Sequence, residues 1–111
     1  MLKFLENKEK IKKKILNLRK EKRKITLAHG VFDLIHLGHL DYFKEAKQLS
    51  DILIVSVTAD KYVDKVLNKP FFGEKDRAFF LTALEMVDYV VINHQSDSTE
   101  LINLIKPNYY V

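Results

Sequence analysis

The stretch that decides the fold is Ile25-Thr-Leu-Ala-His-Gly-Val-Phe-Asp-Leu-Ile-His-Leu-Gly-His39, where an apolar run meets a glycine and then two histidines. Residues 25–28 have the pattern of a buried strand, and Gly30 after them is a turn signal. A helix is expected to begin near Gly38 or His39. Ligands of open α/β sheets bind beyond the carboxyl ends of the strands, so this junction is the expected binding site.

The chain beyond this junction alternates between strand and helix patterns. Residues 60–67 are expected to form either a further helix or a loop. The remaining segments predict two more strands, at 51–57 and 89–92, helices at 41–49, 74–86 and 98–105, and the start of a fourth strand at 108–111. Strands that alternate with helices predict an α/β protein with a Rossmann-like open parallel sheet and helices on both faces.

The segment before the junction is predicted to be a basic amphipathic helix over residues 2–20. Its apolar positions recur at spacings near three and four, at Leu5, Ile11, Ile15 and Leu18. The basic residues that give the chain its net charge of +4 are concentrated in residues 1–24. A solvated helix face explains them better than a nucleic-acid site, because Phe4 is the single aromatic residue among them. We therefore expect an N-terminal helix at 1–24 and a domain at 25–111.

Composition narrows the class of protein. The 111 residues, 47% of them hydrophobic, are enough for one domain with a real core. The absence of cysteine excludes disulfides and thiolate metal sites. No apolar run approaches the ~20 residues of a membrane span, and the N-terminus lacks the pattern of a signal peptide. These features predict a cytoplasmic protein without a membrane partner.

The residue types at the junction suit an anionic ligand. Gly30 lets the backbone approach a phosphate, since it carries no Cβ. The N-terminus of the following helix favours negative charge. His36 and His39 flank that helix start, and imidazoles can donate hydrogen bonds to phosphate oxygens.

The longer frame Gly30-x-Phe32-Asp33-x-x-His36-x-Gly38-His39 resembles the cytidylyltransferase-like nucleotidyltransferases, whose signature is HxGH. It is similar to that of glycerol-3-phosphate cytidylyltransferases and of the adenylyltransferase part of heptose-phosphate synthases. The resemblance covers about residues 25–111. It implies the nucleotidyltransferase type of Rossmann-like sheet and the transfer of a nucleoside monophosphate from CTP or ATP to a phosphorylated sugar or polyol, with release of pyrophosphate. It leaves the base and the acceptor open.

The resemblance also implies roles for individual residues. His36 and His39 would hold the triphosphate and stabilise the leaving pyrophosphate, and Arg77 would clamp phosphates. Lys65 or Lys69 would meet the acceptor phosphate. The nucleotide pocket would be lined by Gly30, Val31, Phe32, Asp33 and Gly38. Mg²⁺ would come with the triphosphate, without a dedicated protein site. Alternatively, Arg77 is a surface arginine paired with Asp76 or Glu74, and Asp33 only caps a helix or orders a turn.

The sequence departs from the family pattern at the C-terminus. Family members continue past the fourth strand into a Ser/Thr-rich motif that contacts the nucleotide, so the domain looks C-terminally truncated at Val111. A non-catalytic nucleotide-binding or assembly module is therefore the alternative to an enzyme. A homodimer is expected, because relatives commonly dimerise and because an uncovered strand edge and the apolar face of the first helix need partners.

Overall fold

The apolar run near residue 55 forms β2 (Ile52–Thr58), a strand buried on both faces as expected for the centre of a parallel sheet. The computed structural model describes residues 3–63 and 70–111. In it β2 lies between β1 (Ile25–Gly30) and β3 (Tyr89–Asn93), and the short β4 (Tyr109–Tyr110) pairs with the other side of β1. All pairs are parallel, in the order β3-β2-β1-β4.

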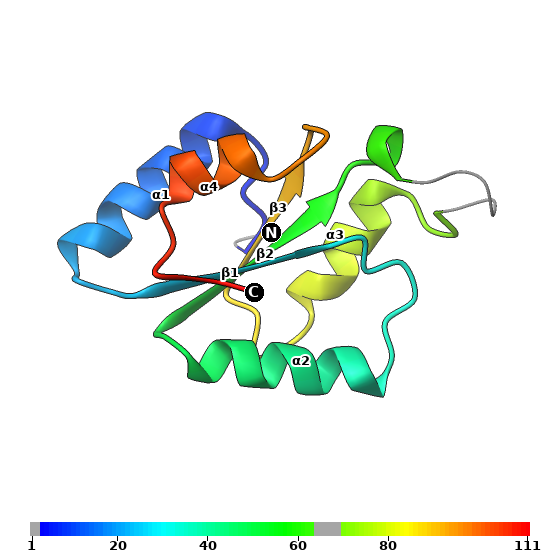
Figure 1. Ribbon diagram of the computed structural model, residues 1–111, viewed down its shortest axis with the longest axis horizontal. Coiled ribbons are helices and arrows are strands. Elements are labelled where there is room, and N and C mark those ends of the chain that lie inside the picture. Colours follow the sequence, from blue (N-terminus) through cyan, green and yellow to red (C-terminus); the bar gives the residue numbers. More distant parts are fainter. Residues whose placement is uncertain (1–2, 64–69) are drawn as a thin grey trace.

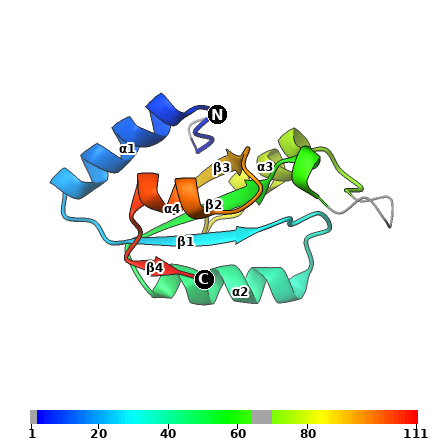
Figure 2. The same ribbon diagram turned by 45° about the horizontal axis from the view of Figure 1, so that its top comes forward.

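Helices cover both faces of this sheet (Figure 1). α1 (Lys8–Lys20) and α4 (Thr99–Ile105) lie together on one face, as Figure 2 shows from a second direction. α2 (Leu37–Gln48) and α3 (Glu74–Thr82) pack into the core on the other face. A single turn of 3₁₀ helix, η1 (Asp60–Tyr62), follows β2. The predicted α/β architecture is confirmed.

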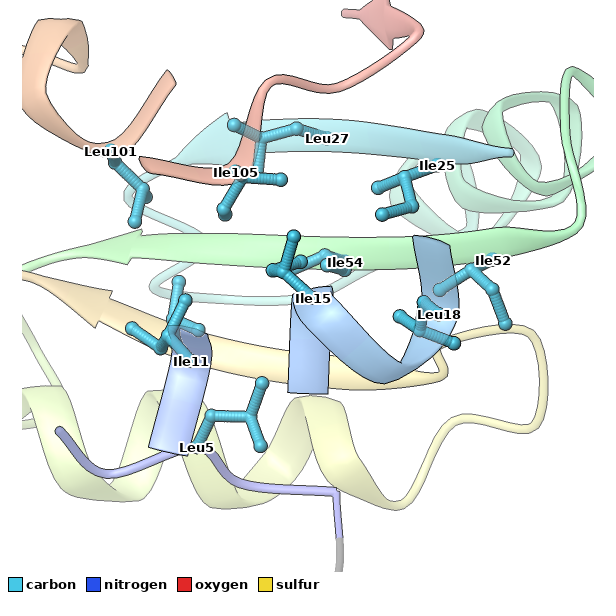
Figure 3. Packing of buried hydrophobic residues seen from close by; sticks show 11 residues of the cluster. Leu5, Ile11, Ile15, Leu18, Ile25, Leu27, Ile52, Ile54, Leu101 and Ile105 are labelled. Carbon is cyan, nitrogen blue, oxygen red and sulfur yellow. The ribbon is translucent and has the colours of Figure 1, made fainter. Parts of the chain in front are cut away.

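Successive side chains of the strands enter different cores. Ile52 and Ile54 face α1 and α4, whereas Leu53 and Val55 face α2 and α3. Figure 3 shows the first core, in which side chains of α1 meet those of β1, β2 and α4. The apolar residues predicted on the first helix are thus buried against the chain's own sheet, and they do not need a partner molecule.

The N-terminal segment differs from the helix predicted over 2–20. α1 begins only at Lys8, where the side chain of Asn7 caps it by accepting a hydrogen bond from the backbone of Lys10 at 2.9 Å. The preceding residues are extended and pair with the outer edge of β3. Val90 donates to the carbonyl of Lys3, and its own carbonyl accepts from Leu5, both at 2.9 Å. These bonds satisfy an edge that lies far away in the sequence, which helical periodicity cannot reveal.

Other boundaries shift by a few residues. α2 starts at Leu37, next to the start expected near Gly38 or His39 and four residues before the helical pattern at 41, because His36 caps it. α3 ends at Thr82 instead of 86, since a series of tight turns follows and buries Val87. α4 begins at Thr99, whose backbone N–H donates to Asp97, while the side chain of the predicted cap Ser98 makes no capping bond. No helix in the described part of the chain is long and apolar enough to cross a bilayer.

Candidate functional site

The two histidines of the motif cap the N-terminus of α2 reciprocally. The backbone N–H of Gly38 donates to Nδ1 of His36 at 3.1 Å, and the backbone N–H of His36 donates to Nδ1 of His39 at 3.2 Å. The ring centroids lie 4.1 Å apart. The predicted pair is therefore brought together beyond the carboxyl end of β1, at a positive helix terminus.

These bonds fix what the rings can offer to a ligand. Because both Nδ1 atoms accept a backbone N–H, the neutral rings carry their proton on Nε2, which can donate to an anionic oxygen. Desolvation lowers the pKa of His39, and the neighbouring His36 lowers it further. The Gly38 N–H is already used by His36, so the rings are the better placed donors for a phosphate.

The glycines of the motif make room for side chains. A Cβ on Gly38 would lie 2.9 Å from Cε1 of His36, and a Cβ on Gly30 would lie 2.8 Å from Cζ of Phe32. The sequence predicted room for a phosphate at Gly30, whereas here the Phe32 ring folds over it. That ring is buried against Phe43, at a centroid separation of 5.0 Å.

Arg77 lies on α3 and is 1% exposed. Its Nε donates to the carbonyl of Phe72 at 2.9 Å, and its Nη1 donates to the carbonyls of Val31 and Thr58, each at 2.8 Å. Its Nη2 pairs with Oδ1 of Asp60 at 2.6 Å. It is neither an exposed arginine nor paired with Asp76 or Glu74, and its expected contact with phosphate stays a prediction.

Asp33 also joins separate segments. Its carboxylate oxygens accept the backbone N–H groups of Phe71 and Phe72, at 2.5 and 2.8 Å. The aspartate of the motif thereby anchors the segment that leads into α3, nearly 40 residues away, and its expected place in the nucleotide pocket stays a prediction.

A cavity of about 380 Å³ opens between the motif and α3. Its walls are mostly apolar, and Arg77 and two carboxylates complete them. The lining residues are Phe32, Asp33, Leu34, Ile35, Phe72, Asp76, Arg77, Phe79 and Phe80.

No role was predicted for one further polar group beside the motif. His29 is half-buried at the end of β1, where its Nδ1 lies 3.1 Å from the hydroxyl of Ser56 and its Nε2 lies 3.5 Å from that of Thr58. Thr58 in turn donates to the carbonyl of Gly30. Burial lowers the pKa of His29. Its place at the carboxyl end of a strand was the available signal.

Two predictions fall on residues without a description. Lys65 and Lys69, expected to meet the acceptor phosphate, lie outside the described residues. Within 3–63 and 70–111, no group of three or more histidine, aspartate or glutamate side chains could hold a metal ion.

Comparison with known proteins gives one family. The model of the family described as cytidylyltransferase-like matches residues 27–111. The chain is 42% identical to the bifunctional protein HldE of Aliarcobacter butzleri over 112 residues, and 39% identical to HldE of Nitratiruptor sp. over 110 residues. These alignments cover 99% and 97% of the chain but only 23% and 24% of the relatives. The chain therefore spans about a quarter of the curated relatives that it matches.

A solved structure agrees. The lipopolysaccharide core biosynthesis protein of Thermoplasma volcanium superposes with a TM-score of 0.74 at 34% identity. The match covers 79% of this chain and 72% of that protein.

Proposed function

The chain belongs to the cytidylyltransferase-like family, and from this premise we propose that it transfers a nucleoside monophosphate from CTP or ATP to a phosphorylated sugar or polyol, releasing pyrophosphate. The similarity to HldE proteins and to a lipopolysaccharide core biosynthesis protein supports a sugar phosphate as acceptor. A reaction that consumes a nucleoside triphosphate fits the cytoplasmic location expected from the sequence.

One observation carries the proposal: the paired rings of His36 and His39 at the start of α2. Their Nδ1 atoms are engaged by backbone N–H groups, so two Nε2–H donors become available at a helix terminus that already favours anions. Donors of this kind stabilise the charge that develops on a triphosphate as pyrophosphate departs.

The chemistry needs little more from the protein. An oxygen of the acceptor phosphate attacks the α-phosphorus in line, a new O–P bond forms, and the bond from the α-phosphorus to the bridging oxygen breaks. The acceptor oxygen is already anionic and needs no strong base, so catalysis consists mainly of positioning and charge stabilisation. We propose no covalent enzyme intermediate, since the chain has no cysteine and the motif holds no activated nucleophile.

We propose that Mg²⁺ binds together with the triphosphate. The ion prefers oxygen ligands and is usually held by substrate phosphates, water and one or two carboxylates. When bound it would neutralise phosphate charge. The residues that we assign to the nucleotide itself are those of the motif, with Lys65 or Lys69 for the acceptor.

The decisive experiment is an assay of pyrophosphate release. ATP and CTP are each tested against a panel of sugar and polyol phosphates, with this chain and with any longer product of its gene. We expect release that depends on both substrates and is lost in His39→Ala. If neither this chain nor a longer product of the gene releases pyrophosphate although nucleotide binds, the alternative is favoured, a non-catalytic nucleotide-binding or assembly module.

We also propose a homodimer, formed through a surface other than α1. The apolar face of that helix is buried within the chain. Large apolar side chains are instead exposed around the motif and α3, at Leu34, Leu37, Phe71, Phe72, Phe79 and Phe80. Four of them, Leu34, Phe72, Phe79 and Phe80, line the same cavity, and exposed apolar side chains gathered in this way mark a contact surface.

A further inference from the structure

Arg77 ties the motif to two other segments. The three carbonyls that it holds belong to Val31 in the motif, Thr58 at the end of β2 and Phe72 before α3. A guanidinium with five N–H donors can bridge such separate acceptors, whereas an ammonium group cannot reach them together. Four of its donor contacts are accounted for by protein atoms, and its side chain is fully buried.

Asp33 closes these contacts into a ring. Its carboxylate holds the N–H groups of Phe71 and Phe72, while Arg77 holds the carbonyl of Phe72 and that of Val31. The path runs from Arg77 through Val31 and the motif backbone to Asp33, then across to Phe72 and back to Arg77. The motif, held at Val31 and Asp33, is thus joined to the segment before α3, held at residues 71–72, about 40 residues later in the sequence.

The ring encloses the least favourable backbone conformation of the motif. Phe32 has φ = 52°, in the left-handed region that bulky residues seldom adopt. Such a conformation persists only where its surroundings determine it. The anchors fall on the residues directly before and after it, Val31 and Asp33, and His36 follows three residues later.

We propose that Arg77 and Asp33 are positioning residues, which hold the motif so that His36 and His39 cap α2 with their Nε2 atoms available to a phosphate. The structure thereby assigns Arg77 a role different from that of a direct phosphate ligand. The inference rests on the proposed function for what the histidines bind, but the placement of their rings can be measured without any ligand.

The test compares Arg77→Lys and Asp33→Asn with a matched control, Asp76→Asn. Asp76 precedes Arg77 and lines the same cavity, yet it takes no part in the ring. The first measurement is ¹⁵N NMR of the histidine side chains in the ligand-free chain. We expect Arg77→Lys and Asp33→Asn each to change the Nδ1 signals of His36 and His39, and the control to leave these signals unchanged. The two variants perturb the ring from its buried and its more exposed side, so that one suffices if the other fails to fold.

The second measurement is calorimetry with ATP and with CTP. A positioning role predicts that Arg77→Lys weakens binding about 10-fold in the parent chain but less than about 3-fold in a His39→Ala background, because coupled residues are not additive. Unchanged ligand-free histidine signals together with additive losses would identify Arg77 as a direct phosphate ligand and overturn the proposal. If neither nucleotide binds the parent chain, the proposed function fails, while the NMR result still decides the positioning role.

Discussion

The backbone N–H of His36 donates to Nδ1 of His39, and the two rings lie 4.1 Å apart at the N-terminus of α2. This relationship gives each ring two tasks, since one nitrogen caps the helix and the other is available to a ligand. Substitutions can separate the two tasks.

His36→Asn and His36→Ala are expected to differ in stability and to agree in activity. Asparagine is a good N-cap, so its side chain can replace the Nδ1 acceptor, whereas alanine leaves the Gly38 N–H without it and should cost about 1 kcal/mol. Both changes remove the Nε2–H donor and should lower kcat about 10²-fold or more. Thermal unfolding and pyrophosphate release measure the two effects. Full turnover in His36→Asn would exclude a role for the Nε2 donor.

Nucleotide binding is expected to take up a proton at His39. The lowered pKa of this ring leaves it mostly neutral in the free chain at pH 7, and a polyphosphate beside it raises the pKa again. Because Nε2 already carries a proton, the added proton binds Nδ1, which then gives up the bond from the His36 backbone N–H. Affinity should therefore increase as the pH falls from about 7.5 to about 6. Calorimetry in buffers of different ionisation enthalpy counts the proton. The same uptake in His39→Gln would show that another group titrates.

Stability is expected to fall on mild acidification because of His29. Burial lowers its pKa below the ordinary value of about 6.5, so below that pH the unfolded chain binds more protons than the folded chain. The contribution is complete above pH 6.5 and is lost as the pH falls toward the folded pKa. In urea unfolding, the free energy of unfolding should depend less on pH between pH 7.5 and 5.5 in His29→Gln than in the parent chain. The pKa of His39 is also lowered, so part of the pH dependence of stability should remain in this variant.

Gly38→Ala and Gly73→Ala form a matched pair. A Cβ at Gly38 would come within 2.9 Å of the His36 ring, which must then leave its capping position. Among the described residues, a Cβ at Gly73 would meet only Asp60 Oδ2, at an ordinary 3.6 Å. We expect a loss of kcat and of about 1 kcal/mol of stability in the first, and little change in either quantity in the second. Equal behaviour of the two variants would contradict the described packing.

The exposed patch around α3 is expected to form the dimer contact. Phe79→Glu should give a monomer by light scattering, because a charge at that position would be buried without a partner. Leu16→Glu is the control, since Leu16 is similarly exposed, at 57% against 59%, but lies on α1. A parent chain that is monomeric at high micromolar concentration would remove the dimer.

The sequence by itself determined the order of the elements, the parallel sheet and the start of α2 near the histidine pair. These features are local, because strand and helix periodicities and a capping motif can be read within a few residues. The segment at residues 3–5 escaped this reading, since the edge of β3 that it pairs with is more than 80 residues away.

Only the tertiary structure decided what Arg77, Asp33 and His29 contact. The acceptors of Arg77 come from residues 31, 58, 60 and 72, and no spacing in the sequence shows that these meet at one guanidinium. Burial has the same origin: an arginine on a helix is usually solvated, and this one is enclosed because the motif and the loop before α3 close over it. Residue types can thus predict which chemistry is present, whereas long-range packing decides which groups face a ligand and which hold the others in place.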